Sequence, residues 1–204
     1  MLSHLHHDHA ELRSLRMLPG VPVVTAPENA RWLERRGVRA VGLGPDEWFE
    51  VSAGVSVRLT PAVHGDRPMP HRPGAANGHL VKVVEEDRTT VVWALGDTEV
   101  YDGIGRTPSL AGAPVDVALV PVSGWGPRLS GGHMGPREAA QVCADASVRA
   151  AVPVHWGTLH VPGGRHLPPG WMDVAGLAFG VAVAEHAAGC RPVVLPVGGS
   201  WDVP

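Results

Sequence analysis

The chain has 204 residues, a length that suits one domain with a substantial core. A hydrophobic content of 44% and a charged content of 18% exclude a disordered chain. The net charge of −3 gives no general attraction to nucleic acid or to an anionic membrane, so neither partner is expected. We predict a single domain over residues 1–204. Cys143 and Cys190 have no partner spacing, which indicates core thiols of a reduced, cytoplasmic protein.

The first candidate element carries four imidazoles and a carboxylate within six consecutive positions, 4–9. Residues i and i+2 of a strand point to the same side, so His4 and His6 at a strand end can bind one ion together. Asp8 and His9 follow that strand, where Ala10–Leu15 resembles a helix start, and they can serve a second ion. The alternatives are a tag remnant or an opportunistic metal binder, but a tag would be a homopolymer and this segment is not one. The pattern therefore predicts a metal centre.

Short strands and helices alternate along the rest of the chain. In chain order, we predict a strand at 21–25, a helix at 27–36, strands at 38–41, 48–51, 55–61, 79–84, 90–95 and 115–122, a helix at 136–147, a strand at 150–154, a helix at 172–188 and a strand at 192–197. Residues 174–184 form the most apolar stretch, which is too short to cross a bilayer, so no membrane insertion is expected. The mixture indicates two packed sheets with helices outside.

Further candidate ligands stand where predicted strands end. His64, Asp97 and His155 each follow a strand, and His133 lies in a loop before a helix. Taken alone, a histidine at a strand end is more often a hydrogen-bonded structural residue, and Gly96-Asp97-Thr98 is commonly a turn. Together with the opening cluster, these residues supply enough groups for two coordination spheres.

The order of these groups resembles that of the metallo-β-lactamase superfamily. Four segments resemble the branch containing N-acyl-phosphatidylethanolamine phospholipase D and the ascorbate-6-phosphate lactonase: 60–64, 96–98, 133–140 and 155–158. The resemblance implies an α/β (α+β) fold, an αββα sandwich of two mixed β-sheets flanked by helices. The family usually enters its first motif through several N-terminal strands, whereas this chain begins shortly before His4. We therefore expect the first sheet to lack N-terminal strands.

The resemblance also implies a ligand set for two divalent metal ions, with Zn²⁺ as the default and Mn²⁺, Fe²⁺ or Ni²⁺ as alternatives. One ion would be held by His4, His6 and His64, the other by Asp8, His9 and His155, and Asp97 would bridge both. Asp8 and His133 are the catalytic candidates, the first for proton relay and the second for contact with substrate or developing charge.

Other residues near these motifs are candidates for the pocket wall. We predict substrate contacts for Trp156 and Arg67, in addition to His133. Further candidates for supporting the ligands or the pocket are each more often structural than catalytic; they are His7, Asp66, Thr98, Trp156 and His160. Trp125 and Trp156 are candidates for lining the pocket, although most tryptophans of the chain are expected in the core.

The predicted function is a metal-dependent hydrolase in which a hydroxide held by two metals cleaves an ester, lactone or phosphodiester of a small molecule. Three alternatives remain. The chain is a shortened family member with weak or no activity, an iron-dependent oxidoreductase on the same scaffold, or an RNA-processing enzyme; the last usually has an inserted domain and basic surfaces. An uncovered sheet edge also leaves a homo-oligomer open.

Overall fold

The computed structural model describes residues 1–64, 72, 74–166 and 168–203. A seven-stranded sheet has the order β3-β4-β5-β6-β7-β8-β9, and two further strands, β1 and β2, form a small parallel sheet. The strands are β1 Val23–Thr25, β2 Ala40–Gly42, β3 Trp48–Ser52, β4 Val55–Pro61, β5 Asn77–Glu85, β6 Arg88–Ala94, β7 Val117–Pro121, β8 Ala150–Val154 and β9 Arg191–Pro192. The helices are α1 Leu12–Arg16, α2 Pro27–Glu34, η1 Ile104–Arg106, α3 Thr107–Ala111, α4 Pro136–Asp145 and α5 Trp171–His186.

The four strands predicted between residues 48 and 95 form two hairpins. Strand β3 pairs antiparallel with β4, and β5 pairs antiparallel with β6. Gly54 turns the first hairpin with a φ of +75°, a left-handed conformation that glycine adopts without steric cost. From β6 to β9 the neighbouring strands run parallel. The large sheet is therefore mixed, with an antiparallel half and a parallel half.

Local sequence explains where two of the helices begin. Proline occupies the first turn of α2 and of α4, where its missing N–H costs no helical hydrogen bond. In α4, the Glu138 carboxylate accepts a hydrogen bond of 2.7 Å from the Gly135 N–H, which satisfies a donor that the helix leaves unpaired. The predicted start of this helix at residue 136 is confirmed.

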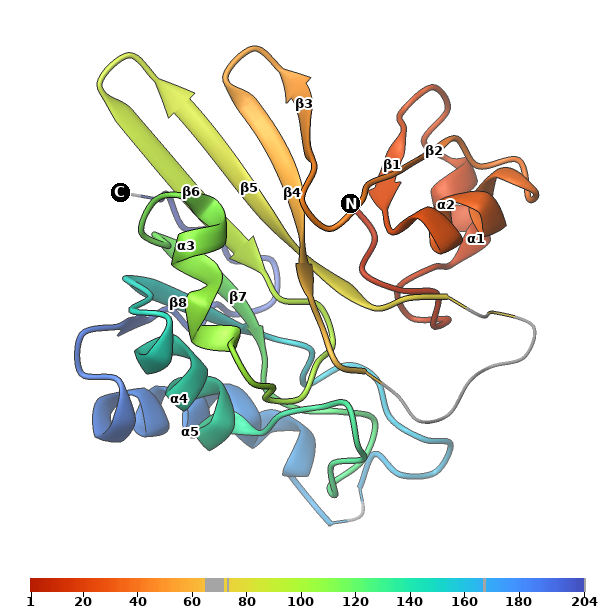
Figure 1. Cartoon of the computed structure of the whole chain (residues 1–204). Helices are drawn as coiled ribbons and strands as arrows, with labels where there is room; N and C mark the ends of the chain where they lie inside the picture. The colour runs from red at the N-terminus through yellow and green to blue at the C-terminus, as the bar shows by residue number, and fades with distance from the viewer. Residues whose placement is uncertain (65–71, 73, 167, 204) are drawn as a thin grey trace.

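The two faces of the large sheet are buried against different layers. Leu80 and Trp93 point toward a core shared with Val142 of α4 and Phe179 of α5. Val57 and Leu59 on β4 point to the other face, where they pack with Val24 of the small sheet and with Leu43. Helices α1 and α2 accompany the small sheet, while α3, α4 and α5 lie with the opposite part of the molecule (Figure 1). The α/β fold with a mixed sheet and flanking helices is confirmed, although the small sheet is purely parallel.

The N-terminal segment joins the two sheets without forming a regular strand. The Leu2 N–H donates to Val24 O at 2.9 Å, and the Asn77 N–H donates to Ser3 O at 3.0 Å. The segment is thus bonded to β1 on one side and to β5 on the other, and no strand is assigned over residues 1–9. The prediction of a strand ending at His4 and His6 is therefore wrong, because the segment is bonded to two different sheets without forming a strand. We call this segment, residues 1–9, the N-terminal tie.

The last predicted strand is much shorter than expected. Strand β9 covers only Arg191–Pro192, whereas the sequence indicated 192–197. Pro192 and Pro196 lack the N–H groups that a sheet ladder requires, which explains the early end. Cys143 and Cys190 are free, buried thiols of the main core, as predicted. Among the described helices, none combines the length and apolar character needed to span a bilayer.

Candidate metal centre

The candidate site lies at the edge of the large sheet where four strands end. Strand β4 is antiparallel to β5, and β5 is antiparallel to β6, so β4 runs in the same direction as β6, β7 and β8. The carboxyl ends of these strands therefore share one edge. His64 follows β4, Asp97 follows β6, and His155 follows β8. The N-terminal tie brings His4, His6, Asp8 and His9 to the same edge.

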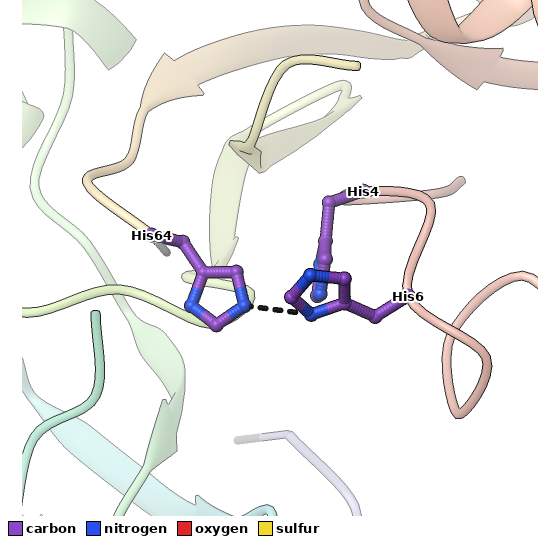
Figure 2. Close-up of side chains that lie close together, drawn as sticks. All are labelled: His4, His6 and His64. Atoms are coloured by element: carbon purple, nitrogen blue, oxygen red, sulfur yellow. Dashed lines mark hydrogen bonds between the residues drawn. The ribbon is translucent and has the colours of Figure 1, made fainter. Parts of the chain in front are cut away.

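One cluster consists of His4, His6 and His64, whose ligand atoms all lie within 4.8 Å of one another. His64 Nε2 is 3.0 Å from His6 Nδ1, and the ring centroid of His4 is 4.5 Å from that of each neighbour. Figure 2 shows the three imidazoles turned toward one another from two distant segments of the chain. Three imidazole nitrogens converging in this way form a suitable site for one divalent cation.

A second cluster consists of Asp8, His9, Asp97 and His155. Asp8 Oδ2 is 3.3 Å from His9 Nε2 and 3.4 Å from His155 Nε2. Asp97 Oδ2 is 3.2 Å from His9 Nε2 and 3.3 Å from His155 Nε2. Two carboxylates and two imidazoles thus face one point, which provides a second set of nitrogen and oxygen ligands.

Asp97 lies between the two clusters. Its Oδ2 atom is also 3.9 Å from His4 Nε2 and 3.9 Å from His64 Nε2. One buried carboxylate oxygen therefore faces imidazoles of both sets. The seven side chains that the family resemblance implied as metal ligands lie together here, and His133 forms a further group with His64 and Asp97.

The protonation states suit metal ligation. Burial lowers the pKa of His4 to about 2, and the nearby His9 adds to the shift. Burial also lowers the pKa of His6 and of His64. Neutral imidazoles are the form that binds a metal ion. Burial alone would raise the pKa of Asp97, but the His9 imidazole holds it below its usual range, so the carboxylate is ionised.

His9 shows that this cluster favours positive charge. Burial lowers its pKa, but the close carboxylates of Asp8 and Asp97 outweigh that effect and raise it to about 10. Asp8, His9, Asp97 and His155 would hold a divalent cation, whose positive charge would be stabilised by the same carboxylates.

Buried polar atoms within the clusters also fit a metal. Among the described residues, His4 Nε2 and Asp8 Oδ1 are buried without a hydrogen-bond partner. An unpaired buried polar atom is costly, and such atoms at a convergent set of ligands are explained by a bound ion. The donor set is entirely nitrogen and oxygen, which suits zinc and other divalent first-row metals.

Several hydrogen bonds orient the ligands, and most of them could not be predicted from the sequence. His64 Nδ1 donates to Gly132 O at 2.7 Å, and His155 Nδ1 donates to Ser123 O at 3.1 Å. These bonds direct each Nε2 toward the cluster. The Ser3 hydroxyl lies 3.0 Å from His4 Nδ1. Only its place beside the first motif could have suggested this residue.

Trp125, predicted as pocket lining, has a more specific contact. Its indole N–H donates to Asp8 Oδ2 at 3.1 Å, although the side chain is 40% exposed. The Val161 N–H donates to Trp125 O at 3.0 Å, so two loops meet beside the second cluster.

His133 also faces the clusters. Its Nε2 atom is 3.8 Å from Asp97 Oδ2, and its Nδ1 atom is 3.2 Å from the Ser130 hydroxyl. It therefore stands beside the ligands, where sequence analysis expected a substrate contact.

Trp156 packs away from this group. Its indole N–H donates to Pro153 O at 3.0 Å, and its ring lies against Gly176 of α5. The described contacts of Trp156 are with the core rather than with the clustered ligands, and its role in substrate binding stays a prediction.

The remaining candidates differ in position. Thr98 is buried and accepts a hydrogen bond from the Val63 N–H, which supports the loop leading to His64. His160 donates to the neighbouring Val161 carbonyl, and His7 is exposed. Arg67 and Asp66 lie outside the described residues.

Comparison with known families agrees with this geometry. The family model described as the beta-lactamase superfamily domain matches residues 1–156, a span that includes every clustered ligand. The chain belongs to the metallo-β-lactamase superfamily. Within it, a UPF0173 metal-dependent hydrolase of Methanoregula boonei is 30% identical over 207 residues, covering 100% of this chain and 82% of the relative. This similarity places the chain in the UPF0173 metal-dependent hydrolase family.

Another UPF0173 relative, from Thermococcus kodakarensis, is 30% identical over 161 residues, which cover 78% of this chain and 66% of the relative. Among solved structures, the metallo hydrolase Igni18 of Ignicoccus hospitalis has a TM-score of 0.73 at 20% identity, covering 98% of this chain and 76% of that one. An isothiocyanate hydrolase from Delia radicum gut bacteria has a TM-score of 0.71 at 14% identity, covering 100% and 76%. These structures share the fold.

Proposed function

We propose that this protein is a hydrolase that uses two divalent metal ions, with zinc as the first choice, to cleave an ester, lactone or phosphodiester bond of a small molecule. The observation that carries the proposal is the position of Asp97 Oδ2, which lies 3.2–3.9 Å from imidazole nitrogens of both clusters. A carboxylate in that position can bridge two ions. Family membership supports the same reading, and a cytoplasmic location belongs to the proposal.

The residues divide into ligands and catalytic groups. His4, His6 and His64 would hold one ion, and Asp8, His9 and His155 the other, with Asp97 shared. When bound, such ions lower the pKa of water toward neutrality and polarise the bond that is attacked. The protein holds the ligands at a buried sheet edge, where electrostatic effects are stronger than in water.

Two side chains are placed for proton and charge handling. Asp8 is held through Oδ2 by Trp125, while Oδ1 has no hydrogen-bond partner among the described residues and can accept a proton from a nucleophile. His133 presents Nε2 toward Asp97, so this nitrogen can donate to an oxyanion that develops beside the clusters. The resemblance to the phospholipase and lactonase branch remains part of this proposal and carries no lipid substrate with it.

Substitution of Asp97 tests the proposal. We expect Asp97→Ala to lose bound metal and to lose hydrolysis by about 100-fold or more, because both ions share this ligand. Elemental analysis of freshly purified protein measures the metal, and a panel of chromogenic esters, lactones and phosphodiesters measures activity. Asp102→Ala, which removes an exposed carboxylate beside Tyr101, is the control and should change neither. Retention of metal and activity by Asp97→Ala would refute the assignment.

A further inference from the structure

Glu99 lies where three loops of the candidate metal centre meet. It follows Asp97 by two positions, and its half-buried carboxylate accepts a hydrogen bond of 2.8 Å from the Gly132 N–H. Its own backbone N–H donates to Val63 O at 2.9 Å, directly before His64. This residue of the loop after β6 is therefore bonded both to the loop after β4 and to the loop before α4.

The backbone that carries Glu99 is itself held in place. The buried Thr98 hydroxyl accepts a hydrogen bond of 2.9 Å from the Val63 N–H, and the Glu99 N–H returns a bond to the Val63 carbonyl. The Glu99 carboxylate is thus presented to Gly132 from a fixed base. A charged acceptor also makes a stronger bond to a backbone N–H than a neutral acceptor does.

Gly132 connects Glu99 to a candidate ligand. Its N–H donates to the Glu99 carboxylate, and its carbonyl accepts a hydrogen bond of 2.7 Å from His64 Nδ1. Gly132 is buried and has a φ of +80°, a left-handed conformation that suits glycine. Both polar groups of its backbone are fixed by other segments of the chain, so the direction of its carbonyl depends on the bond to Glu99.

We propose that Glu99 is a positioning residue of the metal centre, because its carboxylate fixes Gly132 and Gly132 directs His64. The imidazole of His64 then faces those of His4 and His6, with 3.0 Å between His64 Nε2 and His6 Nδ1 (Figure 2). The inference rests on the proposed function, since it concerns a ligand of one of the two ions. Loss of a group that orients a metal ligand typically weakens metal binding 10- to 100-fold.

The effect should fall mainly on one of the two ions. The second cluster has no hydrogen bond to Glu99 or Gly132 in the part of the chain that the structure describes, and its His155 is directed by Ser123 O instead. His133 follows Gly132 directly, so a displacement of Gly132 would also move the side chain expected to contact substrate.

Two substitutions separate the hydrogen-bond acceptor of Glu99 from its charge. Glu99→Gln keeps a side-chain oxygen that accepts from Gly132, whereas Glu99→Met keeps the length of the side chain and removes the acceptor. We expect Glu99→Met to weaken one bound ion about tenfold or more, and Glu99→Gln to bind both ions nearly as the wild type does. Competition with a chromogenic chelator measures both affinities. Glu86→Met, in the exposed turn at the other end of β6, is the matched control and should change neither.

Hydrogen exchange of the metal-free protein tests the same contact without any ion. In nuclear magnetic resonance spectra, the Gly132 amide should exchange faster in Glu99→Met than in the wild type or in Glu99→Gln. The signal of the His64 Nδ1 proton should be lost in Glu99→Met alone. A role confined to general stability would lower the melting temperature without these local changes. Glu99→Ala serves as a second variant without the acceptor if Glu99→Met does not fold.

Three results would overturn the proposal. They are wild-type exchange at Gly132 in Glu99→Met, wild-type affinity for both ions in Glu99→Met, and a Glu99→Gln variant that behaves as Glu99→Met does. A wild-type protein that binds no metal refutes the proposed function instead. The exchange measurements on Gly132 and His64 then still decide whether Glu99 directs this histidine.

Discussion

Trp125 is partly exposed and reaches the candidate ligand Asp8 through one hydrogen bond. Its indole N–H donates to Asp8 Oδ2 at 3.1 Å and fixes the carboxylate that faces His9 and His155. Trp125→Phe keeps the ring and removes the donor. We expect metal affinity or activity to fall about 10- to 100-fold, the usual effect of losing a bond that orients a ligand.

The measurement for Trp125 is metal titration together with hydrolysis of the best substrate of the panel. Trp201→Phe is the control, because that ring stacks with Arg191 instead of contacting a clustered ligand. An unchanged metal affinity and an unchanged rate in Trp125→Phe would show that the bond does not orient Asp8.

His79 predicts a pH dependence of stability that is separate from the metal ligands. Burial lowers its pKa to about 4 from a usual value of 6.5, and its Nε2 lies 3.3 Å from Val24 O. The unfolded chain therefore takes up this proton first as pH falls. The contribution of neutral His79 to the free energy of unfolding is fully present above pH 6.5 and declines as the pH falls toward 4. Below pH 4 it does not change further, and the total loss is about 3 kcal/mol.

Urea unfolding of wild-type protein and of His79→Gln at several pH values measures this effect. The variant should lose less stability than the wild type between pH 6.5 and 4, whatever its stability at neutral pH. Equal slopes in the two proteins would contradict the assignment. Other titrating groups are common to both and cancel in the comparison.

At the scale of elements, the turn after β6 depends on glycine. Gly96 has a φ of +66°, and a Cβ atom there would lie 2.8 Å from Ser3 Cβ and 2.9 Å from Asn77 O. Gly96→Ala should therefore destabilise the protein by about 1–3 kcal/mol and displace Asp97, which follows directly. Thermal unfolding and metal content test this. Gly180→Ala, where an added Cβ meets nothing within 4 Å, is the control.

The elements that carry the site could largely be predicted from the sequence. Alternating apolar runs predicted the strands before His64, Asp97 and His155, and the shared direction of those strands then determines that their ends meet. The His-rich motif supplied the other ligands. Only a few residue types, such as histidine and aspartate, bind metal ions through their side chains, so candidate ligands can be recognised in a sequence.

Other features depend on contacts that have no local signature. The bond of the N-terminal segment to β1 and β5 joins residues more than 20 positions apart, and a regular strand was expected instead. The direction of Trp156 is set by the space over Gly176, which appears only when α5 packs against β8. The exposure of Leu177 was hidden for the same reason, since an apolar helix does not reveal in its sequence which side meets the core.

For the whole molecule, metal should contribute to stability by mass action. An ion that binds only the folded chain adds about 4 kcal/mol when its free concentration is about 1,000 times the dissociation constant. Treatment with a chelator should therefore lower the melting temperature, and added zinc should restore it. Asp97→Ala is expected to show little response to either treatment. A wild-type melting temperature that ignores both chelator and zinc would argue against a bound ion in the folded protein.

The hydrogen bonds of residues 2–3 to both sheets imply that a bound metal ion would also affect how firmly the two sheets are held together. His4 follows a backbone that is fastened to the small sheet through Val24 and to the large sheet through Asn77, while His64 and His155 belong to the large sheet alone. A metal ion that binds these imidazoles would therefore also hold the small sheet and the large sheet together. The association of the two sheets would then strengthen as the metal site fills. Metal addition should accordingly slow amide hydrogen exchange at Leu2 and Asn77.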